Sequence, residues 1–165
     1  NLLNHFYDLQ EDQKASFEAK LELCESEFEK SVFTVLHEMG YTVIPQVKVG
    51  SYRIDLVVES DGDQRLAVEC DGDSYHGPEQ WHDDMIRQRA LERAGWTFWR
   101  CFASSWEVER FNMIQSLQSK LDSMGIRATH GISSLIQDVE NREWLYEKLD
   151  SKVIDNNLEI ELLLN

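Results

Sequence analysis

The stretch of sequence that decides the fold runs from residue 52 to residue 71 and reads YRIDLVVESDGDQRLAVECD. Two largely apolar runs, 52–59 and 64–71, flank the turn-forming triplet Asp61-Gly62-Asp63, so the stretch predicts two strands joined by a short turn. Each run carries acids among apolar neighbours, where an unpaired charge is costly to bury. The acids therefore indicate that a cation binds at the end of these strands.

The predicted turn also fixes which side chains share a face. If the turn holds an odd number of residues centred on Gly62, Asp55 faces Glu69 and Arg53 faces Asp71 across an antiparallel ladder. Directly paired residues share a face, and side chains on one strand return to the same face at every second residue. We therefore expect all three acids on one side of the sheet, and a turn with an even number of residues would separate Asp55 from the other two.

The segments around this pair of strands alternate between helical and extended patterns. Gly40 ends a helical pattern of apolar residues, which fits one long helix or two in succession, and Ser104 or Ser105 is expected to cap a later helix. The order is α-β-β-β-α-β-α, which predicts an α/β fold. The predicted ranges are helix 10–39, strands 41–49, 52–59 and 64–71, helix 80–94, strand 96–102, helix 111–124, and a further helix and an apolar tail after residue 131.

Length and composition predict one globular domain. The chain has 165 residues, of which 42% are hydrophobic, and no apolar run reaches the length of a membrane helix, so we expect no membrane partner. The first residue is not Met and no signal-peptide pattern follows, so we expect a domain of a longer cytoplasmic protein. Cys24, Cys70 and Cys101 are widely spaced, which favours reduced thiols in the core over disulfides or a zinc site.

The net charge of −15 weighs against a large nucleic-acid-binding surface, because phosphate backbones are bound by Lys and Arg. The acids crowd the N-terminal and C-terminal segments, where solvated helix faces are the simplest interpretation. The main basic concentration follows the acidic strand ends and consists of Arg87, Arg89, Arg93 and Arg100. We expect these arginines to contact DNA phosphates, together with Arg53.

Asp55, Glu69 and Asp71 are the candidate metal ligands. Mg²⁺ takes oxygen ligands and is usually held by one or two carboxylates with water and substrate, and Mn²⁺ is a possible substitute. Alternatively, Asp55 and Asp71 cap backbone groups or pair with Arg53. His76 follows in a loop near the same strand ends, which makes it a candidate general acid, general base or phosphate contact.

Several segments in combination carry a family resemblance. Together they resemble the PD-(D/E)XK nuclease superfamily, and most closely its branch of very-short-patch repair endonucleases, whose domains are often attached to superfamily 1 helicases. The resemblance covers residues 25–124, with 1–24 as an N-terminal helical extension and 125–165 as a C-terminal helix and tail. The segments are RIDLV at 53–57, AVECDGDSYHG at 67–77, DMIR at 84–87, LERAGW at 91–96, and Arg100.

The resemblance implies a restriction-endonuclease-like αβββαβ core, a central mixed sheet flanked by helices, and metal-dependent DNA cleavage. It implies that Asp55 and Glu69 are metal ligands and that Glu29 is the acid of the first core helix. Gln46 matches a polar position on the first strand, and His76 and Arg87 match polar positions near the site. One departure is visible, because Asp71 replaces the lysine that usually follows the acid by two residues. Asp71 is thus either a third metal ligand or a base that positions water.

Three hypotheses follow. The first is an active Mg²⁺-dependent endonuclease that nicks DNA or processes its ends, within a helicase-type protein of DNA repair or defence whose other domains supply most DNA affinity. The second is an inactive nuclease fold kept for docking to nucleic acid or protein. The third is an assembly domain that uses its acidic termini and Leu-rich tail, and the same tail could inhibit the site by mimicking nucleic acid. The sequence leaves the oligomeric state open.

Overall fold

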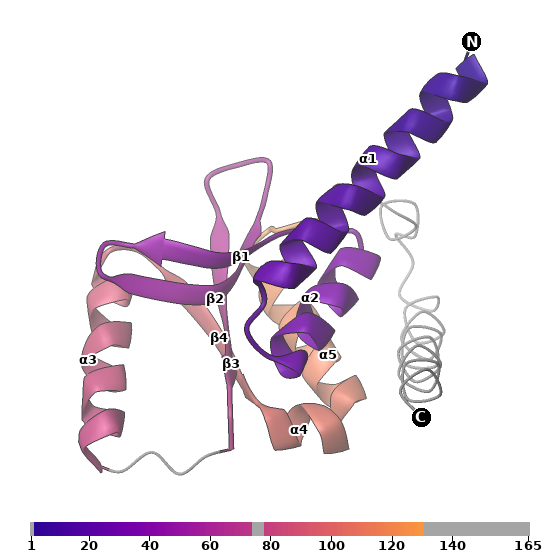
Figure 1. Cartoon of the computed structure of the whole chain (residues 1–165). Coiled ribbons are helices and arrows are strands. Elements are labelled where there is room, and N and C mark those ends of the chain that lie inside the picture. The colour runs from indigo at the N-terminus through magenta and orange to yellow at the C-terminus, as the bar shows by residue number, and fades with distance from the viewer. Residues whose placement is uncertain (1, 74–77, 131–165) are drawn as a thin grey trace.

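The computed structural model describes residues 2–73 and 78–130 (Figure 1). Every strand predicted in this part is present to within one residue at either end, and each predicted helix is present with shifted ends or divided in two. The elements are α1 Leu2–Leu23, α2 Glu27–Glu38, β1 Thr42–Val49, β2 Tyr52–Glu59, β3 Arg65–Asp71, α3 Pro78–Arg93, β4 Thr97–Phe102, α4 Ala103–Val108 and α5 Arg110–Ser123.

The four strands form one mixed sheet in the order β1-β2-β3-β4, with β1, β2 and β3 antiparallel and β4 parallel to β3. This confirms the predicted α/β fold with a central mixed sheet. The β2–β3 ladder pairs Glu59 with Arg65 and Leu56 with Val68, which is the register of a turn centred on Gly62. The last of these pairs leaves Asp55 and Glu69 as the next residue on each strand, so the two acids lie where the paired part of the ladder ends.

Helices cover both faces of the sheet. On one face Val68 packs in a core with residues of α2 and α5, including Val32 and Leu117. On the other face Ala67 packs with Leu91 of α3. Figure 1 shows α3 on one side of the strands and α2 and α5 on the other. Alternate residues of β3 therefore serve different cores, and Glu69 is on the α3 face because it follows Ala67 by two residues.

The helical pattern at the N-terminus forms two helices because an N-terminal cap at Ser26 interrupts it. Ser26 is extended, and its Oγ accepts a hydrogen bond from the Glu29 backbone N at 3.1 Å, while Glu29 Oε2 accepts one from the Glu25 backbone N at 2.9 Å. Phe17 and Leu21 of α1 pack against the core, and the first turns of α1 project away from it (Figure 1). The cap is important for the site because it fixes the position of Glu29.

The capping prediction for the helix after β4 is wrong. The segment forms two helices, α4 and α5, and the residue at the N-cap of α4 is Phe102, which makes no side-chain cap bond. Ser104 is in the first turn and does not cap it. The Asp73 carboxylate accepts hydrogen bonds from the Ser104 backbone N and Oγ, both at 2.8 Å. An acceptor from a distant strand end thus replaces the local cap, because β4 runs into α4 without a loop.

The described part of the chain ends against the core. Ile126 is fully buried, and the Gly40 carbonyl oxygen accepts hydrogen bonds from the backbone N of Thr129 and of His130. The predicted C-terminal helix and tail after residue 131 lie outside the described residues. Among the described helices, none has the length and apolar character needed to cross a membrane.

Candidate active site

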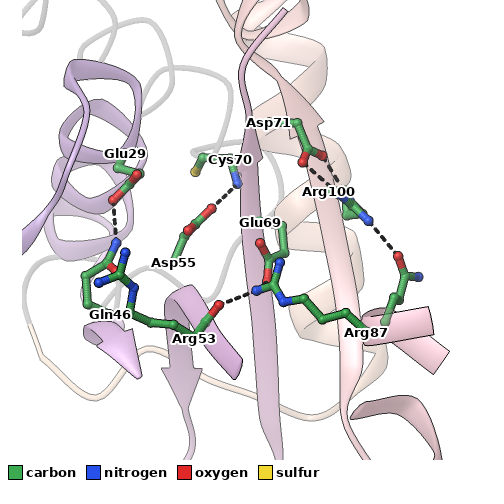
Figure 2. Close-up of polar contacts among 10 residues, drawn as sticks. Glu29, Gln46, Arg53, Asp55, Glu69, Cys70, Asp71, Arg87 and Arg100 are labelled. Carbon is green, nitrogen blue, oxygen red and sulfur yellow. Dashed lines mark hydrogen bonds and ion pairs between the residues drawn. The ribbon is translucent and has the colours of Figure 1, made fainter. Parts of the chain in front are cut away.

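The candidate site lies at a fork between β2 and β3, beyond the last pair of their ladder. Asp55 Oδ2 accepts a hydrogen bond from the Cys70 backbone N at 2.9 Å, so a side chain takes the place of a ladder partner (Figure 2). Glu69 precedes Cys70, and only 5% of its surface is exposed. The expectation that Asp55 and Glu69 come together is consistent with this arrangement, because the charge of Asp55 acts on the Glu69 carboxyl.

Arg87 enters the fork from α3. Its Nη2 lies 3.0 Å from Glu69 Oε1, and it also donates to the carbonyl oxygen of Arg53 (Figure 2). The side chain of Arg53 itself is directed elsewhere and pairs with Glu25 at 2.6 Å. One guanidinium from α3 therefore bridges the two strands at the point where their own pairing has stopped.

The surroundings of the fork disfavour the ionised form of both acids. Burial, followed by the charge of Asp55, raises the pKa of Glu69 to about 8, although Arg87 and Arg100 oppose the shift. Burial also raises the pKa of Asp55, and the hydrogen bond from the Cys70 backbone N limits that rise. Glu69 is buried and Asp55 partly buried, and Arg87 alone compensates poorly for two neighbouring carboxyls with raised pKa values. They favour protonation or the binding of a further cation.

Buried Glu29 and partly buried Gln46 form a second polar pair beside the fork. Glu29 Oε2 accepts a hydrogen bond from Gln46 Nε2 at 2.8 Å, and Glu29 is 6% exposed. In the β1–β2 register Gln46 falls opposite Asp55, between the pairs Pro45–Leu56 and Val47–Ile54, and its backbone has a φ of 55°. Such a left-handed conformation is costly for a residue other than glycine and is concentrated at functional sites.

The Gln46 amide has one orientation available. A carboxylate only accepts hydrogen bonds, so the nitrogen must face Glu29 and Oε1 must face away from it. Oε1 is buried, and no described residue donates a hydrogen bond to it. Leaving a buried carbonyl oxygen without a partner costs about 1–3 kcal/mol. Gln46 therefore presents a free oxygen acceptor on the strand next to Asp55.

Asp71 is held differently from the acids of the fork. Arg100 donates to both of its carboxylate oxygens, with Nη2 to Oδ1 at 2.7 Å and Nε to Oδ2 at 2.9 Å. Arg100 Nη1 also donates to Gln88 Oε1 at 2.7 Å. The alternative in which Arg53 pairs with Asp71 is wrong, because β4 brings Arg100 alongside β3 while Arg53 turns toward Glu25.

The remaining predicted residues are not gathered at the fork. Arg89 and Arg93 are exposed on α3, and in the described part of the chain neither forms an ion pair with an acid. His76 lies outside the described residues. Within residues 2–73 and 78–130, no three His, Cys, Asp or Glu side chains converge in a group able to hold a metal ion. The carboxylates placed at the fork are those of Asp55 and Glu69.

Two polar residues near the site were not predicted from the sequence. Asp84 and Gln88 of α3 line a small cleft together with Glu69, Arg87 and Arg100. The signal that would have found them is their spacing, because residues 84, 87, 88 and 91 recur on one face of a helix. Leu91 is buried on that face, so the polar residues on the same face of the preceding turns also face the sheet.

A protein-family model described as REase_MTES_1575 matches residues 28–121, more than half of the chain. The chain belongs to this restriction endonuclease-like family. The matched range contains Glu29, Gln46, Asp55, Glu69 and Arg87, so it includes the whole fork. No curated protein and no solved structure gives a significant match to the chain. Membership of REase_MTES_1575 agrees with the fold and indicates a nuclease.

Restriction endonuclease-like proteins typically use divalent metal ions. The oxygen atoms available as metal ligands at the fork of this REase_MTES_1575 member fit a hard cation. Two carboxylates and a carbonyl oxygen without a hydrogen-bond donor suit Mg²⁺, which prefers oxygen ligands and commonly takes only one or two carboxylates. The nearby sulfur is a poor ligand by comparison, because burial raises the pKa of the Cys70 thiol and keeps it protonated. The residues present therefore fit Mg²⁺ or Mn²⁺ better than a thiophilic metal.

Proposed function

We propose that the chain is a Mg²⁺-dependent DNA endonuclease domain that hydrolyses phosphodiester bonds, with Asp55 and Glu69 as the metal ligands and Mn²⁺ as a possible substitute. The observation that carries the proposal is that buried Glu69 and partly buried Asp55 lie together at the β2–β3 fork, with the pKa values of both raised. A site that keeps two such acids together without a full counter-charge is suited to binding a divalent cation. Membership of a restriction endonuclease-like family supports the same reaction class.

The bound metal would supply charge on the scissile phosphate, an activated water and stabilisation of the leaving oxygen. The chain's own residues orient the groups around it. The Cys70 backbone N–H holds the Asp55 carboxylate in place, and the N-terminal cap at Ser26 holds Glu29. Glu29 in turn fixes the Gln46 amide, so that Gln46 Oε1 is available to accept a hydrogen bond from water in the site.

Asp71 has a separate role in this proposal. Both of its carboxylate oxygens accept hydrogen bonds from Arg100. Asp71 could act as a third metal ligand or as a base only if Arg100 moved away. We propose that Asp71 positions Arg100, and that Arg100 contacts a substrate phosphate beside the fork. His76 remains a candidate general acid or base, and it lies outside the described residues.

The strongly acidic composition limits how much DNA affinity the domain provides. With a net charge of −15, the arginines on α3 and β4 offer few phosphate contacts against a large repulsion. We therefore propose that the domain belongs to the branch similar to very-short-patch repair endonucleases, and that helicase-type domains of a parent protein supply most of the affinity. The proposed context is DNA repair or defence, with nicking or end-processing as the reaction.

The test is cleavage of supercoiled, linear and single-stranded DNA by the purified chain in Mg²⁺ or Mn²⁺. Asp55→Asn and Glu69→Gln should each lower the rate more than about 100-fold, because even outer-shell partners of a metal are worth about 10- to 100-fold. Asp61→Asn is the matched control, since it removes the same charge from an exposed turn. Cleavage that persists in both site variants would refute the proposal.

The inactive docking module is a second candidate, and one observation favours it: Glu69 and Asp71 already have arginine partners. In that case the wild-type chain would bind DNA or protein without cleaving DNA at any metal concentration. Asp55→Asn and Glu69→Gln would then leave binding unchanged. Metal-dependent cleavage by the wild type would exclude this candidate.

A further inference from the structure

Arg87 is a cation already in contact with one of the proposed metal ligands. A single guanidinium nitrogen, Nη2, lies 3.0 Å from Glu69 Oε1 and also donates to the Arg53 carbonyl oxygen. Figure 2 shows this side chain reaching toward Glu69 and the end of β2. Because α3 carries Arg87 while β2 and β3 carry the acids, the contact does not depend on neighbours in sequence. It is a tertiary contact that the fold has built at the fork.

A count of formal charges shows how incomplete this compensation is. Asp55 and Glu69 together carry two negative charges when ionised, the nearby Glu29 acts on Asp55 as a further acid, and Arg87 returns one positive charge. The Glu69 side chain is 6% exposed and the Arg87 side chain 27%, so the acid is buried while the guanidinium is near solvent. A divalent cation bound by Asp55 and Glu69 would balance these two acids and would compete with Arg87 for the Glu69 carboxylate, with its own positive charge close to the guanidinium. Like charges at close range in a poorly solvated site repel strongly.

We infer that Arg87 is an internal counter-ion of the metal-free fork, that a divalent metal ion displaces its guanidinium from Glu69, and that the released group binds a phosphate oxygen of the substrate. The inference rests on the proposed function, since it assumes that Asp55 and Glu69 bind the metal. A guanidinium presents a planar fork of donors that matches phosphate geometry. Arg87 is thus a positioning residue that couples metal loading to phosphate binding.

Arg100 supplies an internal comparison. It holds Asp71 through two hydrogen bonds and is itself held by Gln88, so three contacts fix its guanidinium. Asp71 is not one of the acids at the fork, and its charge is already balanced by Arg100. Metal binding at Asp55 and Glu69 should therefore leave the Arg100–Asp71 pair intact while it releases Arg87.

The experiment is nuclear magnetic resonance of arginine guanidinium groups in the full chain, titrated with Mg²⁺ in the absence of DNA so that no turnover occurs. A guanidinium held in an ion pair rotates slowly and gives resolved Nη signals, and a released one gives averaged signals. Arg87→Lys assigns the Arg87 signals, and Arg89→Gln is a matched control on the exposed face of the same helix. The Cys70 amide reports metal binding independently, because its hydrogen bond ends on Asp55.

We expect Mg²⁺ to shift the Cys70 amide, to average the Arg87 signals and to leave the Arg100 signals resolved, with the same result in Arg89→Gln. Dimethyl phosphate is a phosphodiester without a nucleic-acid strand. It should restrain Arg87 again in the Mg²⁺-loaded protein and not in the metal-free protein. A shifted Cys70 amide with Arg87 still restrained would overturn the inference and leave the proposed function standing. No response of Cys70 to Mg²⁺ would overturn both.

Discussion

Glu69 and Asp71 are two residues apart on one strand and point to the same face, yet their surroundings differ. Glu69 is buried at the fork and contacts one nitrogen of Arg87. The charge of the neighbouring Asp55 also acts on it. Asp71 is closer to solvent, and Arg100 satisfies both of its oxygens. The charge of Asp71 is therefore balanced within the fold, whereas the charges at the fork are not. The acids whose negative charge the fold leaves without a full counter-charge are therefore the ones suited to bind an added cation.

The largest expected effect is on catalysis. Glu69→Gln should lower metal-dependent DNA cleavage more than about 100-fold, whereas Asp71→Asn should lower it about tenfold or less, since it acts only through the position of Arg100. Rates measured under single-turnover conditions at saturating Mg²⁺ separate the two variants. Equal losses in both would show that Asp71 works within the metal site, and the distinction between the two acids would be lost.

The next effect is a pH dependence of stability that belongs to the fork. The folded-state pKa of Glu69 is raised to about 8, so the folded protein binds protons more tightly than the unfolded chain does. Stability of the metal-free protein should therefore fall as pH rises from the ordinary carboxyl range toward 8. The loss should reach a few kcal/mol, at about 1.4 kcal/mol per pKa unit.

Chemical denaturation at a series of pH values checks this trend, and Glu69→Gln should flatten it because the substituted amide does not titrate. Asp71→Asn serves as the control and should keep the wild-type slope. Saturating Mg²⁺ should also remove the slope in the wild type, because the metal supplies the missing charge. A wild-type stability that rises between pH 5 and 8 would contradict the account of the fork.

A smaller effect should appear at the Arg100–Asp71 pair. Its side chains are 33% and 24% exposed, so solvent screens the pair and removing it should cost only about 1 kcal/mol of unfolding free energy. Arg100→Lys should lose most of that energy, because an ammonium cannot donate to both oxygens in the same plane. A double-mutant cycle with Asp71→Asn measures the coupling, and a coupling near zero would mean that the pair does not hold Asp71.

The smallest effect should come from Gln88, which supports Arg100 from α3. Gln88→Ala removes two hydrogen bonds between exposed groups, one from Arg100 at 2.7 Å and one to Glu92 at 2.9 Å, so we expect a loss of about 0.5 kcal/mol or less. Cleavage should change little. A loss of cleavage comparable to that of Glu69→Gln would instead place Gln88, and the cleft it lines, in direct contact with the substrate.

The register of the sheet could be predicted because it depends on local chemistry. Gly62 sits between two aspartates in a turn whose odd length sets the pairing of Leu56 with Val68, and this pairing carries Asp55 toward Glu69. The break between α1 and α2 was left open, although Ser26 and Glu29 already form a capping pattern in the sequence. In both cases the determining residues lie close together along the chain.

The partners of the charged residues could not be predicted, because they depend on how distant elements meet. Arg87 reaches Glu69 only because α3 packs on that face of the sheet, and Arg100 reaches Asp71 because β4 is parallel to β3. The left-handed backbone of Gln46 is also invisible in a sequence, since no glycine marks it. The predicted cap of α4 was wrong for the same reason. The acceptor for the Ser104 backbone N is Asp73, which follows the end of another strand.

Anomalous diffraction of Mn²⁺ in crystals of the wild-type chain is the direct test of a metal site at Asp55 and Glu69. The account predicts an anomalous peak at the fork, within metal-ligand distance of both the Asp55 and Glu69 carboxylates, about 2.0–2.4 Å for such oxygen ligands. The peak should be absent from Asp55→Asn crystals grown under the same conditions. A peak at Asp71 or Asp84 instead, or an empty fork in a protein that cleaves DNA with Mn²⁺, would contradict the account.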